Sequence, residues 1–249
     1  MVKVTGPMGS HDASGTLRAP PIFSSSLRNR HARIPPAAPP AAAGGSLLFA
    51  AGTNNCNAPS INNSNQYPGT IEAWFKPASM NGLLAGTFFG TAIAGASIGI
   101  DVSNINAFVA FNNKFYARGQ ANYLPLATWA HIALTWQINL MQMWINGTLG
   151  NQSTGAGFTL THHSGFHVGG RLRPIDPDLD AHITQVRFSD IRRYTSNFTP
   201  ATDFTADANT LALYKMLEGT GTTVADDSGN GHTLNFPVSN LPTWSTEIP

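Results

Sequence analysis

Apolar and polar residues alternate in short runs from residue 46 to the end of the chain, and glycine, asparagine and proline separate these runs. In residues 70–76, TIEAWFK, every second residue from Ile71 to Phe75 is apolar, and residues 129–136, WAHIALTW, alternate in a similar way. An apolar residue at every second position is typical of a strand with one buried face. The same criteria predict further strands over residues 46–50, 83–89, 97–101, 105–111, 114–118, 140–145, 166–169, 182–188, 210–216 and 232–236.

Two of these strands are expected to form a hairpin. After Trp136 the chain turns within Gln137–Asn139, returns as LMQMWI over residues 140–145 and then reaches Asn-Gly, a strong turn signal. No stretch of ten residues has the spacing of an amphipathic helix, and only residues 190–198 leave room for a helical turn. Many short strands at these spacings predict an all-β fold of two stacked antiparallel sheets.

The composition agrees with one β domain and an appendage. The chain has 249 residues, which is within the single-domain range of all-β folds, and only 11% of them are charged. Its 24 glycines and 17 prolines favour short strands joined by tight turns. We therefore expect one sandwich over residues 46–249, preceded by an arm over residues 1–45.

The arm is basic and rich in proline and alanine. Five basic residues against one acidic residue give it a net charge of +4, and the segment PPAAPPAAAGG over residues 35–45 predicts a stiff spacer that ends in a hinge. Alone, the arm buries too little apolar surface to offset its ordering entropy, so we expect it to become ordered only against another molecule. An acidic protein surface suits its charge better than nucleic acid, because no interleaved aromatic residues accompany the basic ones. The predicted anchoring residues are Arg18, Arg28, Arg30 and Arg33.

Cysteine usage and the apolar runs restrict the remaining classes. Cys56 is the only cysteine, so no intrachain disulfide can form, and a small buried side chain is expected there. The first thirty residues contain no apolar run of signal-peptide length, and no later stretch reaches about 18 apolar residues. Neither a signal peptide nor a membrane span is therefore expected.

The strand sequences resemble, in their order, those of laminin-G-like domains of the concanavalin A superfamily. The resemblance covers about residues 46–249 and rests on SLLFA, TIEAWFKP, WAHIALTW, LMQMWING, FHVGG and HITQVRFSDIRRYTSNFTP. Its most specific segments, 186–200 and 207–236, are similar to a variety found in bacteriophage virion proteins. The resemblance implies a jelly-roll sandwich that often binds carbohydrates or surfaces, and in phages a part of the tail, a fibre or a capsid decoration.

The chain departs from this family at one pair of positions. The family commonly has an acidic Asp-Glu pair where this chain has Thr184 and Gln185. Enzymatic relatives of the fold are glycosidases, which need two carboxylates on one strand. The three glutamates, Glu72, Glu218 and Glu247, have no acidic neighbour at i+2 or i+4, so catalysis is not expected, and Glu72 is the residue to mutate in testing for it.

Two groups of side chains invite a metal interpretation. Asp176, Asp178 and Asp180 offer oxygen ligands at alternate positions, as a calcium-binding loop does, but the glycine and the distal glutamate of an EF-hand are missing. A solvated loop is the expected structure, with calcium as the alternative. His162, His163 and His167 lack a nearby cysteine or glutamate and are expected to be surface or hairpin histidines.

Asp226 and Asp227 are expected to form turns beside Gly229 and Gly231.

Aromatic residues are candidates for stacking on sugar rings. Four tryptophans lie in predicted strands and are expected in the core, namely Trp74, Trp129, Trp136 and Trp144. Three aromatic residues in or beside loops are the candidate glycan-binding residues, namely Tyr123, Phe166 and Trp244.

The favoured function is that of a non-enzymatic virion structural protein, made in the host cytoplasm and displayed on the phage particle. Its arm would bind capsid or tail subunits, and the sandwich, as a homo-oligomer, would project outward. The alternative function is a carbohydrate-binding lectin or adhesin whose ligand is a host-surface glycan, with or without calcium. A glycoside hydrolase is the third and least supported function.

Overall fold

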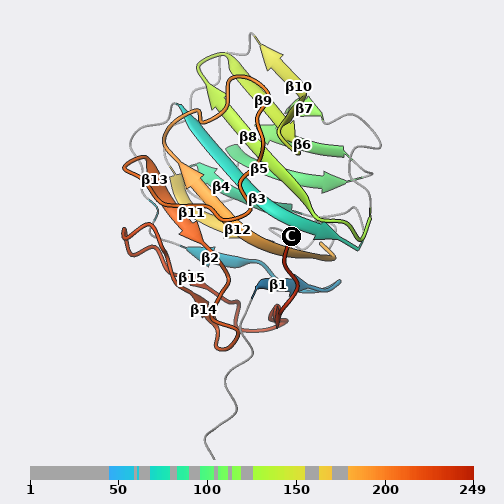
Figure 1. The fold of residues 1–249 in the computed structure, drawn as a ribbon, viewed down its shortest axis with the longest axis vertical. Helices are drawn as coiled ribbons and strands as arrows, with labels where there is room; N and C mark the ends of the chain where they lie inside the picture. The colour runs from blue at the N-terminus through green and yellow to red at the C-terminus, as the bar shows by residue number, and fades with distance from the viewer. Residues whose placement is uncertain are drawn as a thin grey trace, which may run out of the picture. The chain divides into compact units, whose positions relative to one another are not determined.

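A computed structural model of the protein describes residues 45–58, 61, 68–78, 83–89, 96–103, 106–111, 114–118, 126–154, 163–169 and 179–249. These residues form two antiparallel sheets, A and B (Figure 1). No helix occurs in the described ranges, so none there could span a membrane. Residues 190–198, which left room for a helical turn, form none. Residues 1–44 of the predicted arm lie outside the described residues, and the boundary of the arm stays a prediction.

Sheet A has eight strands in the order β10, β9, β8, β3, β12, β1 and β16, with β13 paired to β12. The strand bounds are β1 Ser46–Phe49, β3 Gly69–Pro77, β8 Ala130–Gln137, β9 Leu140–Ile145, β10 Thr148–Thr154, β12 Ala181–Ser189, β13 Thr210–Tyr214 and β16 Thr243–Ser245. The expected hairpin is confirmed as β8 and β9, where Gln137 pairs with Leu140. Asn146 and Gly147, both with positive φ, then form the turn into β10.

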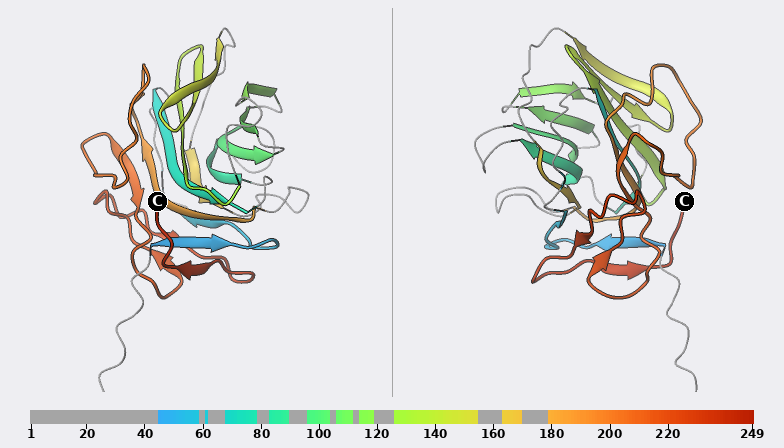
Figure 2. Two further views of the ribbon diagram at one scale, coloured as in Figure 1. Left: turned by 45° about the vertical axis from the view of Figure 1, so that its right-hand side comes forward. Right: turned by 90° about the vertical axis from the view of Figure 1, so that its left-hand side faces the viewer.

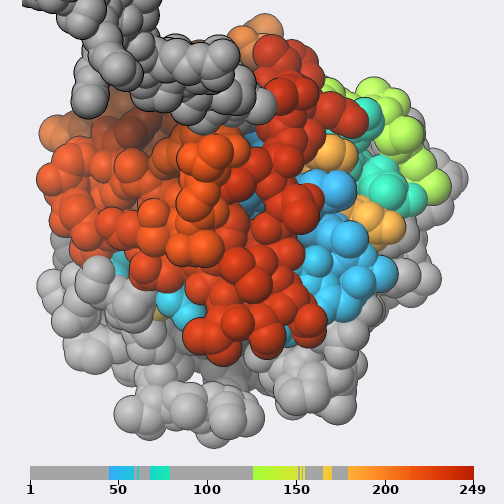
Figure 3. Space-filling model, turned by 90° about the horizontal axis from the view of Figure 1, so that it is seen from below, coloured from blue at the N-terminus to red at the C-terminus, as the bar shows by residue number. Residues whose placement is uncertain are grey.

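Sheet B also has eight strands, in the order β14, β15, β2, β11, β4, β5, β6 and β7, and it faces sheet A (Figure 2). The bounds are β2 Cys56–Ala58, β4 Leu83–Phe89, β5 Ala96–Ser103, β6 Asn106–Phe111, β7 Lys114–Arg118, β11 His163–Val168, β14 Thr223–Val224 and β15 Leu234–Asn235. Seen from below, residues 45–58 (blue) and the C-terminal residues (red) share one face (Figure 3). The all-β, two-sheet fold is therefore confirmed.

Every predicted strand overlaps an observed one, and four observed strands, β2, β10, β14 and β16, were not predicted. Three of them contain only two or three residues, which is too few to show an alternation. In β10, TLGNQST, Leu149 is the only large apolar residue, so the sequence shows no alternation there. This strand lies at the edge of sheet A.

The core lies between the two sheets, and the alternation in β3 explains which side chains enter it. Ile71, Ala73 and Phe75 have no exposed surface and point inward. Rings from the two sheets stack there, with Phe166 of β11 and Phe188 of β12 separated by 5.4 Å between centroids. The opposite side chains of β3, from Glu72 to Lys76, therefore point to the outer face of sheet A.

Residues 190–207, which we call the cover segment, cross this outer face (Figure 2). The Thr70 hydroxyl of β3 donates a hydrogen bond to the Ile191 carbonyl at 2.7 Å and accepts one from the Arg193 amide at 2.9 Å. The Phe198 amide donates to the Gly147 carbonyl at 2.9 Å. A second buried layer, outside the main core, thus lies between sheet A and the cover segment.

Candidate functional site

A β-bulge in β12 determines which side chains meet on the outer face of sheet A. Thr184 lies opposite Trp74 of β3 and Arg187 lies opposite Glu72, so β12 has one extra residue between these pairs. Gln185 has a φ of 50° there, and its Oε1 accepts a hydrogen bond from a backbone amide of the cover segment at 3.0 Å. Because side chains alternate between the faces of a strand, Arg187 would point into the core without the extra residue.

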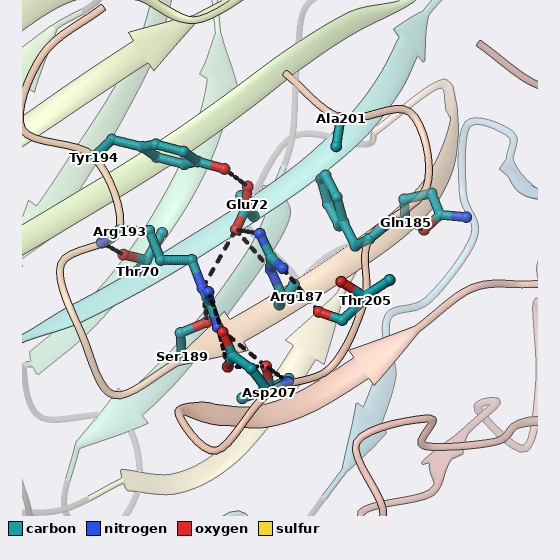
Figure 4. A network of polar contacts seen from close by, with 12 residues as sticks. Thr70, Glu72, Gln185, Arg187, Ser189, Arg193, Tyr194, Ala201, Thr205 and Asp207 are labelled. Carbon is teal, nitrogen blue, oxygen red and sulfur yellow. Dashed lines mark hydrogen bonds and ion pairs between the residues drawn. The ribbon is translucent and has the colours of Figure 1, made fainter. Parts of the chain in front are cut away.

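The bulge places Arg187 beside Glu72, at the centre of a buried polar network (Figure 4). Glu72 has no exposed surface, and its Oε1 lies 2.8 Å from Arg187 Nε and 2.7 Å from Arg187 Nη2. Its Oε2 accepts a hydrogen bond from the Tyr194 hydroxyl at 2.6 Å, and His131 Nε2 lies 3.1 Å away. Arg193 Nε is 3.9 Å from Oε1. The partners of this carboxylate thus come from two neighbouring strands, β8 and β12, and from the cover segment.

The surroundings of Glu72 favour its ionised form. Burial alone would raise the pKa of this carboxyl, but the hydrogen bond with His131 and the positive charge of Arg187 outweigh burial and hold the pKa below its ordinary value. Burial, together with the negative charge of Glu72, raises the pKa of Tyr194. Tyr194 therefore stays protonated and donates its hydrogen bond.

This network attaches the cover segment to sheet A. Arg193 forms two hydrogen bonds with Asp207, at 2.8 and 2.7 Å, and this pair lowers the pKa of Asp207. The Trp74 indole donates to the Ala201 carbonyl at 2.8 Å. Since the Glu72 carboxylate is enclosed, it has no access to a glycosidic bond. Its role here is to hold the cover segment.

A hollow of about 370 Å³ opens on the other side of the bulge. Lys215 and Asp203 form an ion pair at 2.7 Å in its wall, and the Thr184 hydroxyl donates to the Lys215 carbonyl at 3.1 Å. The Gln185 side chain points away from the Glu72 network (Figure 4). The residues that line the hollow are Gly45, Thr184, Gln185, Thr202, Asp203, Lys215, Leu217, Ile248 and Pro249. It combines charged and amide groups with an apolar wall.

The last residues of the chain extend from the hollow to the C-terminal end of β3 and the N-terminal end of β12. Glu247 forms an ion pair with Lys76 and lies 3.7 Å from His182 Nε2. His182 Nδ1 is 3.4 Å from the Ser46 hydroxyl. Burial lowers the pKa of His182 below its ordinary value and Lys76 adds to this effect, whereas Glu247 and Asp180 oppose it. The Ser46 hydroxyl is fully buried, so this Ser-His-Glu arrangement offers no accessible nucleophile.

Most of the predicted site residues lie outside the described residues. This holds for the anchoring residues Arg18, Arg28, Arg30 and Arg33, for the glycan candidate Tyr123 and for the calcium candidates Asp176 and Asp178. These assignments stay predictions. Asp180 is described, and its backbone carbonyl accepts a hydrogen bond from Ala78 at 2.8 Å. Within the described ranges no three His, Cys, Asp or Glu side chains form a group that could hold a metal ion.

The two other glycan candidates have partners inside the protein. Phe166 has no exposed surface and stacks on Phe188 and Tyr214, so it cannot stack on a sugar, and this assignment is wrong. Trp244 is half-buried, its indole donates to the Gly221 carbonyl at 2.9 Å, and its ring lies 5.6 Å from that of Phe236. Its role in glycan binding stays a prediction.

Several residues have the structural roles that the sequence predicts. Cys56 is buried, and burial raises its pKa. Asp226 accepts hydrogen bonds from the Leu213, Ser228 and His232 amides at 2.9 to 3.0 Å, which confirms the turn. His167, expected at the surface or in a hairpin, instead lies in β11 between β2 and β4, where it is partly buried and hydrogen-bonded to Asn55.

The sequence GASIG at residues 95–99 matches the Gly-x-Ser-x-Gly pattern of hydrolase nucleophiles. That chemistry requires the serine at a sharp turn from a strand into a helix. Ser97 instead lies within β5, where it pairs with Phe88 of β4. The match therefore identifies no nucleophile.

Three of the four tryptophans expected in the core, Trp74, Trp129 and Trp144, lie on the outer face of sheet A. Trp136 is buried in the core, and Trp144 is buried beneath the cover segment. Trp74 and Trp129 are only half-buried, which corrects the prediction for both. The alternation within residues 70–76 contained this information, because Trp74 shares its strand face with Glu72.

An all-β sandwich with these two sheets is a laminin-G-like fold. A family model described as the concanavalin A-like lectin/glucanases superfamily matches residues 50–197 of the chain. The chain therefore belongs to this superfamily, which confirms the resemblance at that level. No curated protein has a significant match to the sequence.

Solved structures with the same fold have low sequence identity to this chain. A "putative carbohydrate binding protein" from Bacteroides ovatus is 16% identical with a TM-score of 0.53, over 83% of this chain and 59% of that chain. Domains LG4-5 of the mouse laminin alpha1 chain are 13% identical with a TM-score of 0.49, over 65% of this chain and 48% of that chain. The Ruminococcus gnavus IT-sialidase CBM40 is 15% identical with a TM-score of 0.44, over 59% of this chain and 91% of that chain. The chain thus spans about half of the first two, and the likeness concerns the fold.

Proposed function

We propose that the protein is a non-catalytic carbohydrate-binding module and that the hollow beside the β12 bulge holds the glycan. The observation that carries this proposal is the pairing, in one hollow of a lectin-type fold, of sugar-compatible polar groups with an apolar wall. Ligand pockets generally combine apolar surface with a few polar groups that fix the orientation of the ligand. The hollow has both.

The polar groups suit sugar hydroxyls, which both donate and accept hydrogen bonds. The Asp203 carboxylate accepts, the Lys215 ammonium donates, and the Gln185 amide adds a donor of its own. Asp203 and Lys215 already hold each other at 2.7 Å, so the pair is positioned before a ligand arrives. Leu217 and Ile248 offer apolar surface to the C–H face of a sugar ring, since both are exposed.

The proposal includes no catalytic step, because the glutamate carboxylates have other partners. Glu72 is buried in its network. Glu218 accepts a hydrogen bond from the Ala225 amide at 2.6 Å, and Glu247 is paired with Lys76. A retaining glycosidase needs two carboxyl groups about 5 Å apart across the substrate. The described glutamates support binding without hydrolysis.

A glycan array tests the proposal directly. The full chain is expected to bind at least one glycan, and Asp203→Ala is expected to weaken that binding about tenfold or more, because a hydrogen bond to a charged group contributes about 1.5–3 kcal/mol. Asp227→Ala is the matched control, since it removes an exposed carboxylate outside the hollow. Absence of binding to any glycan, or equal losses in the two variants, would overturn the proposal.

A second candidate function is the display of this module on a virion by the N-terminal arm. Its support is the resemblance of segments 186–200 and 207–236 to phage virion proteins, together with the arm's net charge of +4. The likeness to the Bacteroides ovatus structure, described as a putative carbohydrate binding protein, supports carbohydrate binding over this function. Deletion of residues 1–44 is expected to leave a folded sandwich that no longer joins particles. Equal incorporation of the truncated chain would refute the anchoring role.

A further inference from the structure

The outer face of sheet A has a partly exposed region next to the hollow, which we call the ledge and define as Trp129, Lys76 and His182. His182 lies opposite Lys76 in the pairing of β12 with β3. Ala130 lies opposite Phe75, so Trp129 flanks Lys76 on the other side. The Trp129 and His182 rings meet edge to face, with centroids 6.3 Å apart. The ledge therefore crosses three neighbouring strands.

The ledge and the hollow are continuous on this face. Thr184 lines the hollow and follows His182 by two residues, so both side chains are on the same face of β12. Glu247, which pairs with Lys76, directly precedes Ile248 in the wall of the hollow. The Trp129 ring lies 6.3 Å from the His182 ring, and one two-residue step along β12, roughly 7 Å, separates His182 from Thr184, which gives a span of roughly 9 Å between the two ends. A single sugar ring is too short to contact both ends.

Trp129 is suited to contact a sugar ring. It is half-buried rather than enclosed, and its indole N–H has no hydrogen-bond partner among the described residues. An aromatic ring with one apolar face and a free donor can bind the C–H face of a sugar and one of its hydroxyls. Trp74, by contrast, already donates to the Ala201 carbonyl.

The charges on this surface point to an uncharged ligand. Lys215 is paired with Asp203 and Lys76 with Glu247, so neither lysine is left for a carboxylate on the sugar. An acidic sugar would also approach the carboxylates of Asp203 and Glu247, and like charges repel. Neutral hydroxyls avoid this repulsion and can form hydrogen bonds with both the lysine and the carboxylate of each ion pair.

We propose that the hollow and the ledge together bind a neutral oligosaccharide of more than one ring, with Trp129 as the contact for the ring farthest from the hollow. This rests on the proposed carbohydrate binding and adds the class and length of the glycan. Affinity should rise with the number of rings until the ligand reaches Trp129. It should then level off.

The test is an array of neutral oligosaccharides of one to four rings beside sialylated and uronic-acid-containing ones, followed by titration of the bound series. We expect neutral glycans to bind, with longer ones favoured about tenfold over single rings. Trp129→Ala should remove this preference for length and leave the binding of single rings unchanged. Trp129→Phe, which keeps an apolar ring, should retain most of it, and Ile138→Ala, an exposed residue elsewhere, should behave as the wild type.

The outcomes separate this inference from the proposed function. If no glycan binds, the proposed function fails and this inference fails with it. If glycans bind through the hollow but acidic ones are preferred, or length has no effect, only this inference is overturned. The same holds if folded Trp129→Ala, verified by its unfolding transition, keeps the preference for long ligands.

Discussion

Replacement of Glu72 by glutamine tests whether the buried network holds the cover segment on sheet A. The substitution keeps the shape of the side chain and removes its charge. Arg187, whose side chain is only 10% exposed, then loses its counter-ion. The new amide also brings a donor toward the donors of Tyr194 and His131. At least one buried polar group is thereby left without a partner.

The expected cost follows from the geometry. Removal of one member of a buried ion pair typically costs 3–5 kcal/mol. Arg187 keeps a hydrogen bond to the Thr205 carbonyl at 3.0 Å and its place over the Phe204 ring at 4.7 Å, which offsets part of the loss. We therefore expect Glu72→Gln to destabilise the protein by about 3 kcal/mol. This is a large fraction of the stability of a typical domain.

The assay is equilibrium unfolding in urea at pH 7, with two further variants. Asp203→Asn breaks the Lys215 pair, in which Asp203 is 69% exposed, and should cost less than about 1 kcal/mol. The double variant Glu72→Gln/Arg187→Met should recover stability relative to Glu72→Gln, since it removes the uncompensated charge. A cost for Glu72→Gln no larger than that for Asp203→Asn would refute the reasoning.

The pH dependence gives an independent check. The pKa of Glu72 is lower in the folded protein than its ordinary value of 4.5. Its contribution is therefore complete above pH 4.5 and is lost as the pH falls through the lower, folded pKa. Glu72→Gln should lack this part of the acid destabilisation, and a curve parallel to that of the wild type would contradict the assignment.

Three further predictions concern stability. Burial lowers the pKa of His167 from 6.5 to about 4, so between these pH values the unfolded chain binds more protons than the folded one, and stability should fall as the pH drops from 6.5 to 4. His167→Gln should flatten this dependence of the urea midpoint on pH. An unchanged slope would contradict the assignment to His167. Gly147→Ala should cost more than about 2 kcal/mol of stability in thermal unfolding, because the new Cβ would lie 1.8 Å from the Phe198 carbonyl oxygen. Gly231→Ala, at a similar φ but with open space around the new Cβ, should cost about 1 kcal/mol. Equal costs would rule out the clash. Asp226→Ala should cost about 1–3 kcal/mol in urea unfolding through its three lost hydrogen bonds and Asp227→Ala almost nothing, and equal effects would refute this role.

The sequence alone was sufficient for the all-β class, most of the strands and the hairpin of β8 and β9. These features depend on local signals, namely the period-two alternation and the Asn-Gly turn, which act between residues close in the chain. The same alternation puts Trp74 on the strand face of Glu72, and the expectation of a core position for Trp74 overlooked this signal. The two-residue strand β14 gave no such signal, because its pairing with β15 rather than its own residues defines it.

Only the tertiary structure decided how the candidate site is built. Glu72 and Arg187 are 115 positions apart, and they meet because one extra residue at Gln185 turns Arg187 to the outer face of sheet A. A bulge changes the face of the sheet on which a side chain lies, but one inserted residue alters the alternation of apolar and polar residues too little to be recognised in the sequence. The hollow likewise joins β12 to Lys215 and Ile248, whose proximity results from packing between distant segments. Alternation along the chain therefore determines the strands, and the packing of distant strands determines the site.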